Sequence, residues 1–223
     1  MDIGVLGTGM VGRTLATSFV ALGHLVTMGG RAAGNPAALE WVRAAPVGGP
    51  SAGTAREGSF AQAAGASAVV INATNGAHSL EALEMAGADN LDGKVLIDVA
   101  NPLDFSHGMP PTLTVCNTDS LGEQIQRRFP AARVVKTLNT VSTDVMVDPG
   151  RVPGGHTMFV CGDDRAAKET ATGLLVELGW TRDDVMDLGD ITACRGTEMY
   201  LPLWLCLRAR AGSTLLNIRV VSR

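Results

Sequence analysis

The chain has 223 residues, with 18 basic and 22 acidic side chains and no basic stripe, so nucleic acid and anionic membranes are poor candidate partners. Its length fits one large domain, or one domain with a small appendage. We see no secretory signal and no apolar run near the ~20 residues of a membrane span, and we expect a cytoplasmic protein. The cysteines lack CxxC and metal-ligand spacing, so we expect reduced, mostly buried thiols and no metal site.

The first part of the chain has the pattern strand, tight turn, helix. An apolar run at 3–6 leads into Gly7-Thr8-Gly9-Met10-Val11-Gly12, and apolar residues at helical spacing continue to Gly23. In a dinucleotide-binding turn the first glycine permits the bend, the second lets the backbone approach a pyrophosphate, and the third lets helix and strand pack closely. Free N–H groups at the helix start would meet the phosphates. We predict a dinucleotide site; the alternative is a glycine-rich turn of structural use only.

A second predicted strand, 24–28, is followed by Gly29-Gly30-Arg31 without an acidic residue. A carboxylate there would hold the ribose 2′-hydroxyl of NAD, whereas an arginine suits a 2′-phosphate. The sequence therefore predicts NADP, with Thr8 and Arg13 as further candidate neighbours of the phosphate. The alternative is that Arg31 is a solvated loop cation.

The remaining elements alternate between helices and strands. Helices are predicted at 36–44 (opened by Asn35 and Pro36), 59–64, 79–86, 120–129 and 165–178, and a helical segment at 191–210 is expected to be interrupted or kinked near Pro202. Strands are predicted at 51–56, 68–72, 95–99, 133–137, 157–160 and 185–188, with breaks at 46–50 and 148–155 and a long irregular loop at 100–111.

The apolar strand runs are typical of a parallel sheet that is buried on both faces. We therefore predict an α/β fold, a Rossmann-type, doubly wound and mostly parallel sheet. The expected division is a Rossmann domain at 1–190 and a C-terminal helical segment at 191–223. That segment would pack over the nicotinamide end of the site or onto a second subunit.

Three loops follow predicted strands and should meet at one edge of the sheet. They are Ala73-Thr74-Asn75, which continues to His78, then Ala100-Asn101-Pro102, and Asn139-Thr140. Their amides and hydroxyls can orient a ring but cannot act as strong acids or bases. Each asparagine is also a common turn former.

Two charged features lie near these loops. Lys136 is the best candidate proton donor, although a surface or salt-bridged lysine is the alternative reading. Arg195 and Glu198 are three residues apart, which is typical of an ion pair on one helical face. We predict no obligatory catalytic side chain, because hydride transfer to a ring that is an electron sink needs mainly proximity and orientation.

With these residues placed, the chain resembles the NADPH-dependent reductases of the deazaflavin coenzyme F-420 (hereafter F420) and the related reductase domains of six-transmembrane metalloreductases. The resemblance covers essentially the whole chain. It rests on the glycine motif, Gly30-Arg31, and the motifs at 135–140, 160–164, 188–190 and 201–203 with Arg195. Two departures are a glycine at position 30, where the family often has serine, and the loop at 101–108.

The resemblance implies NADP with Thr8, Gly30 and Arg31 around the 2′-phosphate and Thr74 and His78 near the nicotinamide. A deazaflavin would stack on the nicotinamide beneath the last helices. The predicted cofactor-binding residues are Gly7, Thr8, Gly9, Met10, Val11, Gly12, Gly30, Arg31, Ala73, Thr74, Asn75, His78, Ala100, Asn101, Pro102 and Asn139.

The predicted function is hydride transfer between NADP(H) and a deazaflavin or similar flat ring, by a homodimer without nucleic-acid or membrane partners. One alternative is an NADPH-dependent reductase of a small imine or carbonyl substrate, which needs a proton donor such as Lys136 or His107. A second alternative is a non-catalytic module that senses NADP.

Overall fold

The computed structural model of the protein describes residues 1–46 and 53–222. The strands are β1 (Asp2–Leu6), β2 (Leu25–Gly30), β3 (Thr54–Ser59), β4 (Val69–Asn72), β5 (Val95–Asp98), β6 (Leu103–Asp104), β7 (Thr112–Leu113), β8 (Arg133–Thr137), β9 (Met158–Cys161) and β10 (Val185–Asp187). The α-helices are α1 (Met10–Ala21), α2 (Pro36–Ala44), α3 (Phe60–Gly65), α4 (Ser79–Ala86), α5 (Ala88–Leu91), α6 (Leu121–Arg128), α7 (Thr143–Val147), α8 (Arg165–Glu177) and α9 (Cys194–Ala211). Short 3-10 helices are η1 (Gly76–His78), η2 (Pro149–Arg151), η3 (Arg182–Asp184) and η4 (Ile191–Ala193).

The main sheet confirms the predicted Rossmann-type topology. Its strand order is β10-β9-β8-β5-β4-β1-β2-β3, and the strands from β3 to β8 are parallel, with β9 antiparallel to β8. The chain leaves β1 toward β2 on one side and returns to β4 on the other, so the strand order reverses at β1. Ligands of open α/β sheets bind at the carboxyl ends of the strands beside such a reversal.

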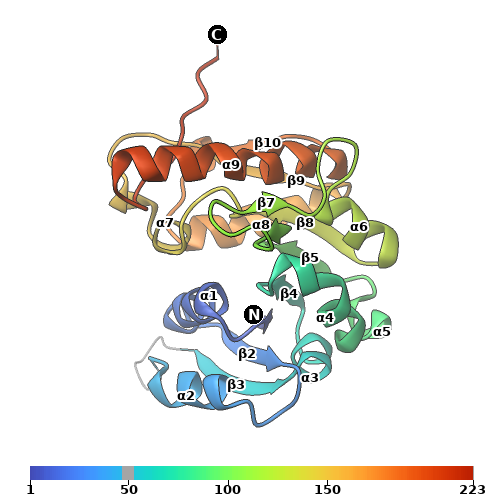
Figure 1. Cartoon of the computed structure of the whole chain (residues 1–223). Helices are drawn as coiled ribbons and strands as arrows, with labels where there is room; N and C mark the ends of the chain where they lie inside the picture. Colours follow the sequence, from blue (N-terminus) through green and yellow to red (C-terminus); the bar gives the residue numbers. More distant parts are fainter. Residues whose placement is uncertain (47–52, 223) are drawn as a thin grey trace.

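Helices cover both faces of this sheet, as in a doubly wound fold. One core contains side chains of α1, α2, α7 and α8, and the other contains side chains of α3, α4, α5, α6 and the start of α9. Figure 1 shows α4, α5 and α6 together on one side and α9 running across the β8 to β10 end of the molecule. Alternate strand residues enter opposite cores, as Val69 and Val70 of β4 do, which explains the unbroken apolar runs in the sequence.

Three predicted elements differ from the structure. The strand expected at 51–56 is β3, shifted toward the C-terminus; it is a half-exposed edge strand and has no apolar run to mark its bounds. Residues 51–52, like most of the predicted break at 46–50, lie outside the described residues. The loop at 100–111 is not wholly irregular, because β6 and β7 pair as a short antiparallel hairpin.

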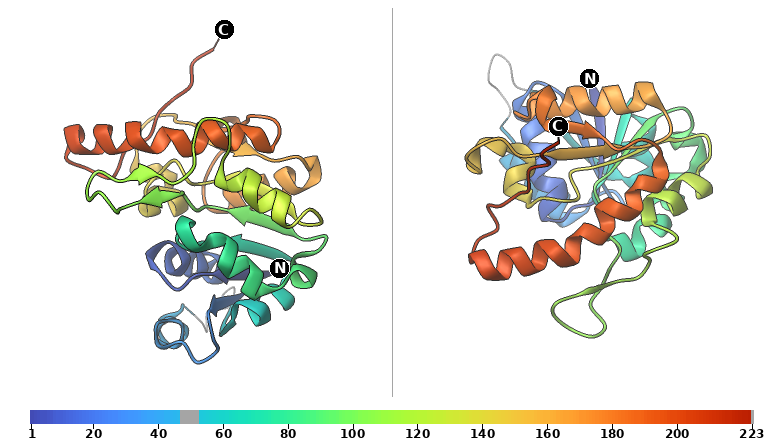
Figure 2. Two further views of the ribbon diagram at one scale, coloured as in Figure 1. Left: turned by 45° about the vertical axis from the view of Figure 1, so that its right-hand side comes forward. Right: turned by 90° about the horizontal axis from the view of Figure 1, so that it is seen from above.

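The third difference is in the C-terminal helix. α9 is not interrupted at Pro202, since the loss of one backbone donor leaves the neighbouring helical hydrogen bonds in place, and the alternative of a kink there stays a prediction. After α9 the chain runs back along the molecule, where the backbone N–H of Thr157 donates to the Ile218 carbonyl at 2.8 Å, and only its last residues project from the body (Figure 2). The division at 190/191 and the packing of this segment on a second subunit stay predictions.

The cysteines were only partly anticipated. All four are free, but Cys116 and Cys206 are exposed whereas Cys161 and Cys194 are buried, so "mostly buried" was wrong for half of them. Within residues 1–46 and 53–222, no group of three or more His, Cys, Asp or Glu side chains could hold a metal ion. In the same part of the chain, no helix has both the length and the apolar character needed to cross a membrane.

Candidate active site

The turn between β1 and α1 has room for a phosphate group. Gly7 has φ of 120°, a backbone conformation that side chains disfavour. A Cβ at Gly12 would lie 2.2 Å from the Gly7 carbonyl oxygen, whereas a Cβ at Gly9 would meet no described atom within 4 Å. Gly9 is also the N-cap of α1 and supplies no side chain to the free N–H groups there. The turn therefore fits the pyrophosphate of a dinucleotide, because its second glycine leaves open space in front of a helix N-terminus.

One pocket, of about 290 Å³, lies in front of this turn, and we call it the Arg31 pocket. It is lined by Gly7, Thr8, Gly9, Gly30, Arg31, Asn35, Phe60, Ala73, Thr74, Asn75, His78, Glu81, Ala82 and Met85. Arg31 is exposed, and Arg13 does not line the pocket. A Cβ at Gly30 would lie 3.0 Å from the Cβ of Asn35, so a side chain at position 30 would crowd the residue that caps α2.

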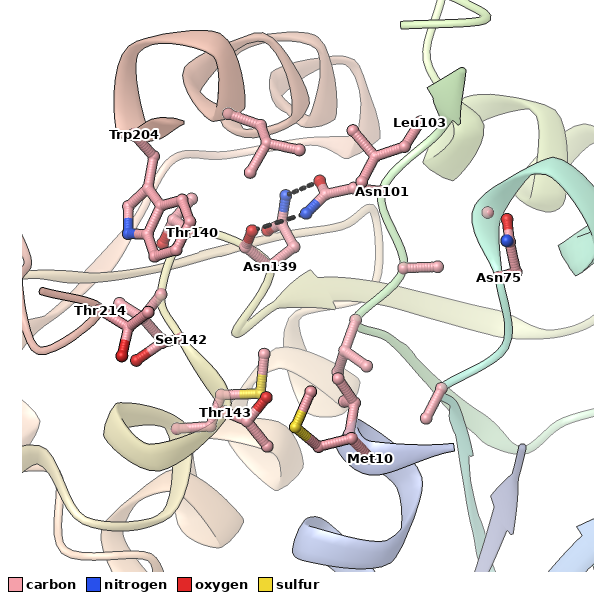
Figure 3. A pocket seen from close by; sticks show the side chains of 18 of the residues that line it. Met10, Asn75, Asn101, Leu103, Asn139, Thr140, Ser142, Thr143, Trp204 and Thr214 are labelled. Atoms are coloured by element: carbon pink, nitrogen blue, oxygen red, sulfur yellow. Dashed lines mark hydrogen bonds between the residues drawn. The ribbon is translucent and has the colours of Figure 1, made fainter. Parts of the chain in front are cut away.

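A second pocket, of about 440 Å³, lies next to the first, and we call it the Trp204 pocket. The two pockets share Ala73, Thr74 and Asn75. The other residues that line the Trp204 pocket are Met10, Val11, Gly76, Val99, Ala100, Asn101, Leu103, Phe105, Asn139, Thr140, Val141, Ser142, Thr143, Met146, Leu201, Trp204, Arg208 and Thr214. Figure 3 shows side chains from α1, α9 and the loops after β4, β5 and β8 around this space.

The three predicted loops thus meet, but two of their asparagines bind each other. Asn139 Nδ2 donates to Asn101 Oδ1 at 3.0 Å, and Asn101 Nδ2 donates to the Asn139 carbonyl at 2.8 Å (Figure 3). This reciprocal pair ties the loop after β5 to the loop after β8. Asn101 uses both Oδ1 and Nδ2 in this pair and Asn139 uses Nδ2, so the two side chains help to hold the pocket wall together.

A buried polar row lies behind this wall, on the α6 side of the sheet. The register of β4, β5 and β8 places Asn72, Asp98 and Lys136 side by side. Asp98 accepts from Asn72 Nδ2 at 2.8 Å and from Lys136 Nζ at 2.7 Å, and Lys136 Nζ also donates to the Ala100 carbonyl at 2.6 Å. Thr74 Oγ1 donates to Asn72 Oδ1 at 2.6 Å, so the row connects directly to a residue of both pockets.

Glu198 of α9 completes the row. Its carboxylate lies 2.8 Å from Lys136 Nζ and accepts the backbone N–H groups of Leu121 and Gly122 at the start of α6. Burial by itself would lower the pKa of Lys136, but the carboxylates of Asp98 and Glu198 outweigh it and raise that pKa above its ordinary value. Lys136 is therefore the salt-bridged lysine of the alternative reading. It stays charged near neutral pH and does not line either pocket.

The predicted ion pair between Arg195 and Glu198 was wrong. Arg195 Nε donates to Glu123 Oε2 at 2.9 Å, and this hydrogen bond lowers the pKa of Glu123. The two side chains leave α9 toward different partners, because Glu198 is drawn into the buried row while Arg195 reaches the surface. Beside the row, the contact with the Cys161 thiol and burial raise the pKa of Cys194, so this cysteine stays a neutral thiol.

The structure places fourteen of the sixteen predicted residues on the two pockets. His78 lines the Arg31 pocket and not the Trp204 pocket, and Gly12 and Pro102 line neither. His107, the other candidate proton donor, is exposed and lines neither pocket.

Sequence reasoning missed Asp98, Glu198 and the pocket residues of α9. Asp98 had a usable signal, because Asn72, Asp98 and Lys136 interrupt three apolar runs at the same end of the sheet. Glu198 and Trp204 had none, since only the packing of α9 against the sheet brings them to this place.

The profile of the family "NADP oxidoreductase coenzyme F420-dependent" matches residues 2–102 of this chain. A crystal structure of a protein from Arthrobacter sp. FB24, assigned as an F420-dependent NADP reductase, is similar over 100% of both chains, with 50% identity and a TM-score of 0.91. The metalloreductase STEAP3 of Rattus norvegicus is 29% identical over 91% of this chain, and this chain spans only 37% of its length.

A more distant likeness concerns the fold alone. A reductive aminase from Aspergillus terreus, solved in complex with NADPH and ethyl-5-oxohexanoate, is 19% identical with a TM-score of 0.66, and the likeness covers 95% of this chain and 63% of that one. At this identity the match supports the Rossmann-type topology and no shared chemistry.

Proposed function

This chain belongs to the family of F420-dependent NADP oxidoreductases, and on this basis we propose that it transfers a hydride between NADP(H) and a deazaflavin or a similar flat ring. The observation that carries the proposal is that the two pockets are neighbours, since both are lined by Ala73, Thr74 and Asn75. A dinucleotide with its phosphates at the glycine turn extends from the Arg31 pocket into the Trp204 pocket, where its nicotinamide meets the second substrate.

Each part of the site has a separate task in this proposal. Gly9 and the start of α1 receive the pyrophosphate, and Thr8, Gly30 and Arg31 surround the 2′-phosphate. Ala73, Thr74 and Asn75 lie where the dinucleotide passes between the pockets. NADPH supplies the hydride, and the protein supplies proximity, orientation and a pocket whose volume is within the range of small-molecule sites.

The position of Lys136 favours a ring acceptor over a small imine or carbonyl. An imine or carbonyl substrate needs a proton during reduction, and neither Lys136 nor His107 lines the Trp204 pocket. A deazaflavin accepts the hydride into its own conjugated ring and requires no strong acid from the pocket wall. Apolar side chains such as Leu201 and Val141 would then cover the ring faces.

Stopped-flow absorbance tests this function. The protein is mixed with NADPH and oxidised F420, and the experiment is repeated with FMN, with a cyclic imine and with NADH in place of NADPH. We expect rapid loss of the deazaflavin absorbance with NADPH and a much slower loss with NADH. Reduction of the imine alone would favour the small-substrate alternative, and tight NADPH binding without turnover of any acceptor would favour a sensing module.

A further inference from the structure

Asn139 presents an unbound hydrogen-bond acceptor to the Trp204 pocket. Its Oδ1 atom accepts no hydrogen bond from any described residue, and yet it is not one of the buried polar atoms that lack a partner. The atom is therefore accessible, although Asn139 as a whole is only 4% exposed. Because Asn139 lines the Trp204 pocket and not the Arg31 pocket, the space that reaches this oxygen is the Trp204 pocket.

The neighbouring side chain of Asn101 fixes which end of the Asn139 amide is free. A backbone carbonyl can only accept, so the 2.8 Å contact with the Asn139 carbonyl must come from Asn101 Nδ2. Asn101 Oδ1 then faces Asn139 and accepts from its Nδ2 at 3.0 Å (Figure 3). The Asn139 amide cannot turn round without placing two oxygens against each other. The pocket therefore meets an oxygen that accepts and cannot donate.

The other two asparagines that line this pocket are already engaged. Asn75 Oδ1 accepts the backbone N–H of Ala77 at 3.0 Å, and Asn101 uses both its oxygen and its nitrogen in the pair with Asn139. Among the described residues, Asn139 is thus the one asparagine of the pocket whose side-chain oxygen has no donor. A buried wall with a single free acceptor favours a ligand that brings an N–H group to it.

The end of β8 lies on the half of the sheet that would receive the nicotinamide. Arg31 follows β2, on one side of the reversal at β1, whereas Asn139 follows β8, on the other side and beyond β4 and β5. In a doubly wound sheet the two halves receive the two nucleotides of the cofactor. A dinucleotide with its 2′-phosphate at Arg31 therefore extends its nicotinamide toward the end of β8.

The nicotinamide ring carries a carboxamide, whose amino group donates and whose oxygen accepts. The backbone N–H groups of Asn139 and Thr140 have no acceptor among the described residues, so this turn offers donors as well as the free oxygen. We propose that Asn139 Oδ1 accepts a hydrogen bond from the carboxamide amino group of the nicotinamide and that Asn101 is the positioning residue that orients Asn139. This inference rests on the proposed binding of NADP(H).

Two analogues of NADP⁺ test the contact by calorimetric titration of the ligand-free protein. The acetylpyridine analogue has a methyl group in place of the carboxamide amino group, whereas the thionicotinamide analogue keeps the amino group and replaces the oxygen by sulfur. We expect wild-type protein to bind the acetylpyridine analogue about 5- to 10-fold more weakly than NADP⁺, and the thionicotinamide analogue within about 3-fold of NADP⁺. Asn139→Ala should bind NADP⁺ and the acetylpyridine analogue about equally.

The ratio of the two affinities separates recognition from a merely structural effect. A general loss of folding or of affinity weakens both nucleotides and leaves their ratio unchanged. Asn75→Ala is the matched control, because Asn75 lines the same pocket but its oxygen is already bound, and this variant should keep the wild-type ratio. Asn101→Ala frees the Asn139 amide to rotate and should reduce the ratio by about 2-fold or more, since orienting the amide then costs binding energy.

Equal wild-type affinity for NADP⁺ and the acetylpyridine analogue would overturn the inference. A wild-type ratio in Asn139→Ala would also overturn it, because the amino group would then have another partner. A wild-type ratio in Asn101→Ala would contradict the positioning role. Because these titrations need neither an acceptor nor turnover, a failure of hydride transfer in the stopped-flow experiment would contradict the proposed function separately from this result.

Discussion

Lys136 Nζ and Glu198 Oε1 lie 2.8 Å apart in the interior, and this ion pair fastens the C-terminal helix to the sheet edge beside the Trp204 pocket. α9 carries Leu201 and Trp204 into that pocket within two turns of Glu198. The same lysine holds the Ala100 carbonyl, just before Asn101. A single buried cation therefore positions two walls of the candidate site from behind.

Replacement of Lys136 by methionine should strongly destabilise the protein. It leaves the buried carboxylates of Asp98 and Glu198 without their cation, and breaking a buried ion pair in this way costs about 3–5 kcal/mol. Urea denaturation at neutral pH measures the change in the free energy of unfolding. Arg182→Met, which breaks a fully exposed pair with Glu169, is the control and should stay close to wild type. Similar losses in both variants would contradict the role assigned to the buried row.

Gly9 and Gly12 should respond oppositely to substitution by alanine. A Cβ at Gly9 meets no described atom, and its φ of −77° is open to any residue, so Gly9→Ala should melt like wild type but bind NADPH at least 10-fold more weakly. A Cβ at Gly12 would overlap the Gly7 carbonyl, so the main effect of Gly12→Ala should be a lower melting temperature. Thermal melts and NADPH titrations measure the two effects, and unchanged NADPH affinity in Gly9→Ala would contradict a pyrophosphate at this turn.

Arg31→Ala should weaken NADPH far more than NADH. A charge-assisted bond to the 2′-phosphate is worth on the order of 1–3 kcal/mol, and NADH has no phosphate at that position. Titration of each nucleotide, followed by fluorescence, gives the two dissociation constants. Arg13→Ala serves as the control, because Arg13 lines neither pocket, and it should leave the NADPH preference intact. Equal losses of affinity for NADPH and NADH in Arg31→Ala would remove the reason to assign NADP.

The free energy of unfolding should decrease at acidic pH, because the ion pair between Asp119 and Arg127 is lost when Asp119 is protonated. Two hydrogen bonds from Arg127 hold the pKa of Asp119 at about 2, below its ordinary value of 3.8. Because the pKa of Asp119 is lower in the folded protein, its carboxylate stabilises the fold at pH values above the ordinary pKa. This contribution is lost as the pH falls from about 4 to 2. We expect a loss of about 1 kcal/mol, since solvent screens a partly exposed pair.

Urea denaturation at pH 5, 3 and 2 measures this loss. The Asp119→Asn variant should have a lower free energy of unfolding than wild type at pH 5. It should lack the part of the decline that comes from Asp119, so that the free energies of the two proteins converge at pH 2. A constant difference between wild type and Asp119→Asn from pH 5 to pH 2 would show that the pair does not titrate as stated.

The glycine turn shows how far local sequence can predict a site. Strand, turn and helix lie within one short stretch, and the roles of Gly7, Gly9 and Gly12 depend mainly on neighbouring backbone. The buried strands were equally predictable, because a strand covered on both faces must be apolar throughout. The edge strand β3 and the β6–β7 hairpin lacked that constraint, which is why their bounds or existence were missed.

The sequence by itself determined the Rossmann-type sheet, the glycine turn and the placement of Arg31 beside it, since these follow from short-range spacing and from the burial of parallel strands. Only the tertiary structure decided that Asn101 binds Asn139, that Glu198 pairs with Lys136 instead of Arg195, and that Trp204 joins the pocket. These contacts join residues far apart in the chain. Their partners are selected by strand register and by the packing of α9 on the sheet, which local patterns do not encode.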